Sequence, residues 1–357
     1  MITRSDALND ALDRLDGYGY LDAPGFAFHG PMGAETLSTL GHDDLVGSWV
    51  EAYKARHEAL DVPATTGRID AHDEAGWRSA LGDMSRVSDW AQLFRRELAG
   101  QPWPEVLQRW LPRLLAGYGG ALTHGLIRVA HGVRALPVDA PPSGLLLDEL
   151  AKGLAFWAAS FTALPGRPDL HGSLALPDAL AGVPRPEETW SPIEAGTFAR
   201  MGELRRFPSA VEALARPGSI DGALSDLTAA FCRAVLTASG PTANALVHTV
   251  TPVAAARTLL PYMAGVSIET VYAQLWHVSA AIVCGFAPPL ASAATTGAPG
   301  LDTPGRPEIL ARAVEHRDTH VLKFAEACAR EDALRPDPVY MRAAHHVLGQ
   351  LPAWRPA

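Results

Sequence analysis

Four of the thirteen histidines lie in apolar stretches of the sequence, where an imidazole ring is expected to be buried. They are His29 in "GFAFHGPMGAETL", His124 in "ALTHGLIRVAHGV", His248 in "ANALVHTVTPVAAARTLLP" and His320 in "THVLKF". A buried imidazole needs a partner on at least one ring nitrogen. Several of them on separate helices can meet this need through a shared metal ion, as in the cores of helical bundles. The alternative is that each is an ordinary histidine with a local hydrogen bond.

Lys323 follows His320 by one helical turn and stands out against the composition. Lysine and arginine number thirty together, but only three of these residues are lysines: Lys54, Lys152 and Lys323. Arginine keeps its proton in a protein, whereas a buried lysine can lose it. A lysine in this apolar segment therefore favours a neutral amine beside His320. The alternative is a lysine at the helix surface that pairs with Glu326.

Three further polar residues are rivals or helpers of this set. His131 lies seven residues after His124, on the same face of a helix, and is either a rival ligand or a group that supports the ligands. His316 and His320, four residues apart, are another candidate chelating pair. Arg128 or His131 would orient a substrate or the metal ligands during catalysis, and the alternative for Arg128 is a surface or ion-pair role.

Flat aromatic side chains in the same segments suit a ligand with fused rings. We expect an apolar pocket walled by such side chains. The candidates are Phe26, Phe28, Trp157, Trp276 and His277. For each aromatic residue the alternative is packing in the core.

The charge pattern and the missing motifs exclude several classes of protein. The formal net charge of −9 is spread without acidic or basic blocks, so the chain lacks the basic footprint of a nucleic-acid-binding protein. The text nearest to a dinucleotide-binding GxGxxG fingerprint, "GYGGAL" at 117–122, lacks the third glycine and a preceding strand. P-loop, GxSxG and HExxH motifs are also missing. We therefore expect a small-molecule ligand and no nucleic-acid partner.

The N-terminal residues lack the basic-then-apolar pattern of a signal peptide, and no uncharged run approaches the roughly 18 residues of a membrane helix. We expect a cytoplasmic protein without a membrane partner. Three widely spaced cysteines argue against a disulfide framework. Whether the chain forms a homodimer stays open.

Helical periodicity dominates the sequence. Apolar residues recur three and four positions apart in most segments, and alternating runs rich in Val, Ile, Thr and Tyr are nearly absent. We predict an all-α fold, organised as a single multi-helix domain over residues 1–357. Long Pro- and Gly-rich loops are expected at 136–144, 164–193 and 287–307. The predicted helices span 4–15, 32–41, 43–59, 74–80, 86–99, 103–116, 121–135, 144–162, 208–215, 220–239, 241–263, 268–285, 307–331 and 337–349.

Four segments around the candidate residues resemble motifs of the questin oxidase-like family. They read "FAFHGPMGAETLSTLGHDDLVGSWVEAY", "THGLIRVAHGVRAL", "LVHTVTPVAAARTLLPYM" and "HVLKFAEACARE", and the similarity runs from about residue 20 to 350 in the same order. The motif histidines match His29, His124, His248 and His320, and the lysine of the H-x-x-K motif matches Lys323. Fungal members carry a second histidine soon after the position of His29 and another near Arg128, and this chain has neither.

The resemblance implies a bacterial member of a family whose fungal members open rings of fused aromatic polyketides such as anthraquinones. It implies a non-haem iron oxygenase, a dioxygenase or monooxygenase, with Fe(II) on the histidines and a modified lysine, and with dioxygen as co-substrate. A neutral lysine amine can add carbon dioxide and become a carbamate, an anionic oxygen ligand. Zinc would compete for the histidines.

Two other functions stay open. One is a non-catalytic helical protein that binds a small molecule and has lost its metal. The other is an NADPH-dependent Baeyer-Villiger-type monooxygenase, the family's older label, for which the chain has no cofactor motif.

Overall fold

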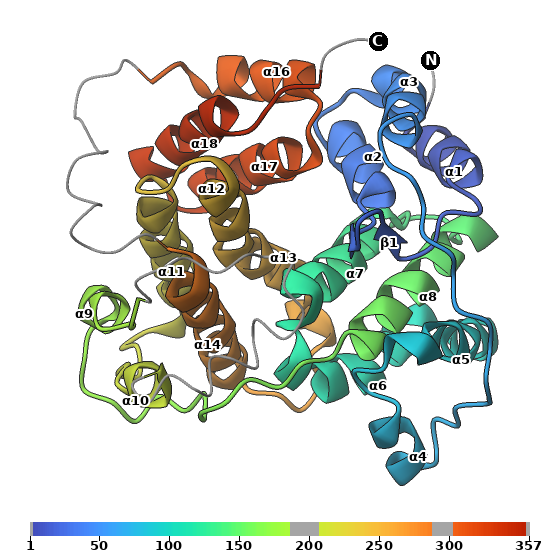
Figure 1. Ribbon diagram of the computed structural model, residues 1–357, viewed down its shortest axis with the longest axis horizontal. Coiled ribbons are helices and arrows are strands. Elements are labelled where there is room, and N and C mark those ends of the chain that lie inside the picture. Colours follow the sequence, from blue (N-terminus) through green and yellow to red (C-terminus); the bar gives the residue numbers. More distant parts are fainter. Residues whose placement is uncertain (1–2, 186–206, 288–302, 355–357) are drawn as a thin grey trace. The chain divides into compact units, whose positions relative to one another are not determined.

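The structure is a computed structural model that describes residues 3–185, 207–287 and 303–354 (Figure 1). Helices make up most of these residues, with one two-stranded sheet, so the predicted all-α fold class is confirmed. The chain divides into two compact units: unit 1 comprises Met1–Ala163 and Ala255–Gly265, and unit 2 comprises Leu164–Ala254 and Val266–Ala357. Its organisation as one domain over residues 1–357 stays a prediction.

Unit 1 contains the first eight α-helices, a short hairpin and several 3-10 turns. The α-helices are α1 Arg4–Arg14, α2 Gly30–Thr39, α3 Asp43–Lys54, α4 Glu74–Ser79, α5 Val87–Gly100, α6 Trp103–Leu114, α7 His124–Ala135 and α8 Gly144–Ala159. The antiparallel strands are β1 Leu21–Asp22 and β2 Phe26–Ala27, and the 3-10 turns are Met84–Arg86, Leu115–Gly117, Gly120–Thr123 and Leu260–Tyr262.

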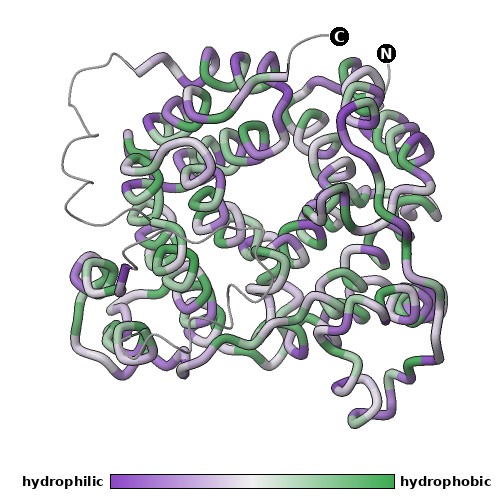
Figure 2. The backbone as a smooth tube through the Cα atoms, viewed as in Figure 1, coloured by the Kyte–Doolittle hydropathy of each residue, from purple (hydrophilic) through white to green (hydrophobic). Residues whose placement is uncertain are grey.

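The helices of unit 1 are held together by their apolar faces. In the tube view most helices carry hydrophobic and hydrophilic residues in turn, the pattern of amphipathic helices (Figure 2). Helix α8 packs against both α5 and α7, and its residues from Gly153 to Ala159 are all buried. The α7–α8 contact matters for function because α7 begins at His124.

Unit 2 contains the remaining helices. They are α9 Leu176–Ala181, α10 Phe207–Glu212, α11 Ile220–Val235, α12 Gly240–Leu246, α14 Ile268–Phe286, α16 Arg306–His316, α17 Thr319–Leu334 and α18 Pro338–Gln350, with a 3-10 turn at Val247–Thr249. Helix α13, Thr251–Leu259, begins in unit 2 and ends in unit 1. The three cysteines, all in this unit, are buried and free of disulfide bonds. No helix in the described ranges has the length and apolar character needed to cross a membrane.

The predicted helix over 307–331 is wrong, because the chain breaks it into α16 and α17. Arg317 adopts a left-handed conformation with φ 66°, which ends α16. Asp318 then caps the next helix, since its carboxylate accepts hydrogen bonds from the N–H groups of His320 and Val321. His320 therefore sits in the first turn of a new helix.

Three other expectations need correction. The predicted helix 241–263 is interrupted by the 3-10 turn that contains His248, and the helix predicted from residue 121 begins at His124. Helix α9 lies within the predicted loop 164–193. Residues 186–193 and 288–302 of the predicted loops lie outside the described residues.

Candidate metal centre

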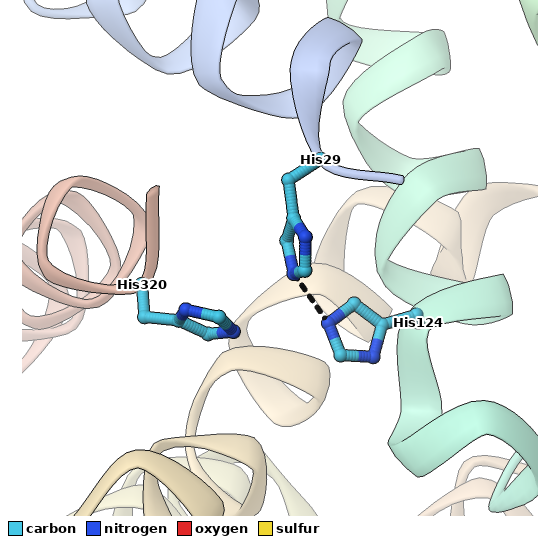
Figure 3. A group of neighbouring side chains, drawn as sticks. All are labelled: His29, His124 and His320. Atoms are coloured by element: carbon cyan, nitrogen blue, oxygen red, sulfur yellow. Dashed lines mark hydrogen bonds between the residues drawn. The ribbon is translucent and has the colours of Figure 1, made fainter. Parts of the chain in front are cut away.

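His29 and His124 form a buried pair in unit 1. Their side chains project from the residue before α2 and from the first residue of α7, and their Nε2 atoms are 2.8 Å apart (Figure 3). The rings meet edge to face, with centroids 4.7 Å apart, and both residues are 5% exposed. Two nitrogens that each lie about 2.1 Å from a metal ion are about 3 Å apart when adjacent in the coordination shell, so this spacing suits two ligands of one ion.

The position of His29 is fixed by a tyrosine and an aspartate. The His29 backbone N–H donates to Tyr53 Oη at 2.9 Å, and the Tyr53 hydroxyl donates to Asp22. Burial raises the pKa of Asp22 to about 6, although the hydrogen bond from Tyr53 lowers it. Burial and the Asp22 charge raise the pKa of Tyr53 well above its ordinary value, so Tyr53 keeps the proton that it donates.

A strained turn holds His124. Ala121, Leu122 and Thr123 have φ values of 46°, 50° and 70°, a run of left-handed residues without glycine. Each such residue costs about 1–2 kcal/mol, so a run of three needs compensation from its surroundings. The turn brings the Ala121 carbonyl to 2.7 Å from His124 Nδ1. When Nδ1 donates to this carbonyl, the neutral ring presents an unprotonated Nε2, the form that binds a metal.

In unit 2, His248 and His320 form a second pair, with ring centroids 5.3 Å apart. His248 Nδ1 lies 3.0 Å from the Asn244 carbonyl, which favours a proton on that nitrogen and an unprotonated Nε2. His320 is held by Asp318, whose carboxylate lies 3.7 Å from its Nδ1. Burial lowers the pKa of His320, and the charge of Lys323 adds to this effect, while Asp318 opposes it. A lowered pKa keeps the imidazole neutral and able to bind a metal.

Lys323 is buried on α17 beside this second pair. Its side chain is 3% exposed, and its Nζ has no hydrogen-bond partner among the described residues. Burial lowers the pKa of Lys323 to about 7, while the charge of Asp318 raises it. Glu326, the partner expected for a surface lysine, pairs with Arg330 at 3.2 Å. Near neutral pH a large share of the amine is therefore uncharged.

The family comparison bears on the first pair. The model described as questin oxidase-like matches residues 49–135, about a quarter of the chain, and this segment includes His124. This segment of the chain is similar to the questin oxidase-like family. A comparison with curated proteins finds no match. The description of the matching model names an oxidase.

Arg128 and His131 also lie in the segment that matches the questin oxidase-like model, and both are engaged by buried carboxylates. Arg128 binds Glu149 through two hydrogen bonds of 2.6 and 2.9 Å. His131 Nδ1 lies 2.6 Å from Glu35 Oε2. Burial raises the pKa of Glu35, but Arg134 and His131 outweigh it and hold that pKa well below its ordinary value. These contacts suit positioning roles; the predicted catalytic roles of Arg128 and His131 stay predictions.

The space beside these residues is small. Arg128, His131, Glu35 and Glu149 line a cavity of about 20 Å³, which has room for one water molecule and is too small for a polycyclic substrate. His316, the other rival ligand, ends α16 and has its Nε2 3.0 Å from the Leu351 carbonyl. The helix break at Arg317 removes the one-turn spacing on which pairing with His320 depended.

The structure distributes the predicted pocket residues over both units. In unit 1, Phe26 is 43% exposed, Phe28 stacks on Tyr18, and Trp157 is buried on α8. In unit 2, Trp276 Nε1 donates to the Val211 carbonyl, and His277 Nε2 lies 2.8 Å from the Pro165 carbonyl. Burial lowers the pKa of His277. These hydrogen bonds give Trp276 and His277 structural roles, and their contact with a substrate stays a prediction.

Sequence reasoning missed the residues that hold the predicted ligands. Asp22 and Tyr53 support His29, Glu35 supports His131, and Asp318 supports His320. Asp318 carried a local signal, because aspartate is a typical residue at a helix N-cap. Asp22 and Glu35 reach their partners only through the fold.

Proposed function

We propose that the chain is a non-haem iron oxygenase that opens a ring of a fused aromatic polyketide of the anthraquinone or anthraquinol class. The observation that carries this proposal is the buried Lys323 amine, one helical turn after His320 and without a hydrogen-bond partner in the described part of the chain. A buried amine without a hydrogen-bond partner does not stabilise the folded chain. A chemical role for the amine accounts for its presence in the core.

The proposed ligands of one Fe(II) ion are the two histidine pairs and the lysine: His29, His124, His248, His320 and Lys323. The ring contacts support this assignment, because the Ala121 and Asn244 carbonyls favour unprotonated Nε2 atoms on His124 and His248. The neutral Lys323 amine adds carbon dioxide, forming an N–C bond and releasing one proton, to give a carbamate. Four imidazoles and one oxygen anion suit iron, and zinc is the expected competitor.

Bound Fe(II) would supply the one-electron chemistry through which dioxygen attacks an aromatic ring. Other residues of the chain hold the proposed ligands in position. Tyr53 fixes the backbone of His29, and Asp318 orients His320 and stays ionised, because hydrogen bonds from His320 and the backbone outweigh burial and lower its pKa to about 2. A phenol or hydroquinone substrate would provide electrons itself, which fits the lack of nicotinamide and flavin motifs.

A second function is favoured by one contact. The direct 2.8 Å approach of His29 Nε2 to His124 Nε2 shows that these rings can satisfy each other without a metal. This arrangement would also serve a helical binding protein that has lost its iron.

Iron content and dioxygen uptake separate the two functions. We would grow wild type, Lys323→Ala and the matched control Lys54→Ala with added iron. We expect about one iron per chain in wild type and control and a loss of most of it in Lys323→Ala. Dioxygen uptake with reduced 1,8-dihydroxyanthraquinone should follow the iron. If none of the three proteins holds iron after anaerobic reconstitution, the binding protein is the better interpretation.

A further inference from the structure

Two buried hydrogen-bond donors in unit 1 have no protein partner. Thr123 is fully buried and Trp157 is 1% exposed. Among the described residues, neither the Thr123 hydroxyl nor the Trp157 indole N–H makes a hydrogen bond. Buried donors are almost always satisfied, and two other buried residues of the same unit follow this rule: Trp90 donates to the Ala80 carbonyl and Thr36 to the Met32 carbonyl.

The two residues flank the N-terminal end of α7, which begins at His124. Thr123 precedes His124 directly. Trp157 packs against Gly125, where an added Cβ would lie only 2.6–3.0 Å from the Trp157 Cα, Cβ and Cγ atoms. Glycine at this position thus lets Trp157 approach the turn that carries His124.

Thr123 does not cap helix α7. A threonine before a helix usually accepts a hydrogen bond from the first turn, but Thr123 has φ 70° and its side chain makes no capping bond. A β-branched residue with this φ is strained. Strain combined with an unpaired hydroxyl is typical of residues that are kept for a ligand.

We propose that the Thr123 hydroxyl and the Trp157 indole N–H donate hydrogen bonds to a phenolic or carbonyl oxygen of the aromatic substrate beside His124. This inference rests on the proposed function and specifies which atoms of its substrate are recognised. An oxygen acceptor satisfies both donors, whereas a hydrocarbon ring system leaves them unpaired. The two groups therefore select oxygenated ring systems, and they fix the ring's orientation relative to His124.

The test is equilibrium dialysis of the full-length protein against 1,8-dihydroxyanthraquinone and, in parallel, against anthracene, which has the same three fused rings without oxygen. The variants are Thr123→Val and Trp157→Phe, which keep most of the shape and remove one donor each. We expect each variant to bind the hydroxylated quinone about 3- to 10-fold more weakly than wild type, with affinity for anthracene unchanged.

Matched controls are Thr36→Val and Trp90→Phe, whose donors already have backbone partners. The controls should bind the quinone like wild type. They should unfold at a lower denaturant concentration than wild type, because each substitution leaves a backbone carbonyl without its hydrogen bond. Without ligand, Thr123→Val should be at least as stable as wild type, and Trp157→Phe should lose less stability than Trp90→Phe, because it leaves no carbonyl unpaired. Unchanged quinone affinity in both variants, or a wild type that binds no quinone, would overturn the inference. The proposed iron site is judged separately by the wild-type iron content.

Discussion

At the scale of single residues, the buried Lys323 amine lowers the stability of the fold, and its proposed function is to bind the metal. The folded chain holds the pKa of this amine near 7, and the unfolded chain restores the ordinary value of 10.5. Between these two pH values the unfolded state binds the proton and the folded state largely does not. The free energy of unfolding therefore falls as pH is lowered through this window.

Replacing this amine should stabilise the metal-free protein. We expect Lys323→Met, which keeps the length of the side chain, to raise the free energy of unfolding by on the order of 3 kcal/mol at pH 7. The gain should shrink as pH rises from 7 toward 10.5 and vanish above it, because the wild-type amine is neutral in both states only above the ordinary pKa of 10.5. Urea titrations at several pH values in metal-free buffer without carbon dioxide would measure it. A gain that does not vary with pH would point to packing instead of proton binding.

The sequence predicted the candidate ligands better than it predicted the residues that hold them by hydrogen bonds. His29, His124, His248 and Lys323 stand among apolar neighbours, so their burial was predictable and the structure confirms it. Their hydrogen-bond partners were not predictable where they come from distant segments, as Tyr53 does for His29. The pairing of Arg128 with Glu149 likewise depends on α7 and α8 packing together, which no local pattern encodes.

At the scale of helices, the close crossing of α7 and α8 decides where His124 and Trp157 lie. We expect Gly125→Ala to lower the free energy of unfolding by about 1–3 kcal/mol, because the new methyl group meets Trp157 backbone and side-chain atoms that cannot easily move. Gly144→Ala, at the start of α8, meets nothing within 4 Å and should be neutral or slightly stabilising. Thermal unfolding of the two variants would compare them. Equal effects would show that the crossing tolerates a wider spacing.

Most helices followed from hydrophobic periodicity, but their interruptions did not. Periodicity continues through Arg317, because the residues on both sides of the break present apolar faces to the core. The break depends on one left-handed residue and on the Asp318 cap, which are weak local signals. The turn at 121–123 could not be predicted for a different reason, because none of its left-handed residues is a glycine.

At the scale of the whole molecule, the proposed ligands come from both units: one histidine pair belongs to unit 1, and the other pair and Lys323 belong to unit 2. If both pairs bind the same ion, metal binding depends on residues from both units at once. If each pair binds its own ion, the two units load independently. Iron stoichiometry distinguishes these cases without any knowledge of the substrate.

We expect His124→Gln in unit 1 and His248→Gln in unit 2 each to remove most of the iron from the whole chain. Two independent sites would instead leave each variant with about half of the wild-type iron. His72→Gln and His171→Gln, exposed histidines of units 1 and 2, are the matched controls and should load fully. A shared ion also stabilises the folded chain by about 4 kcal/mol when the free metal exceeds the dissociation constant 1,000-fold. Iron should therefore raise the unfolding temperature of the wild type and the controls, and leave that of both His→Gln variants unchanged. Stabilisation retained in either variant would show that one pair binds the ion alone.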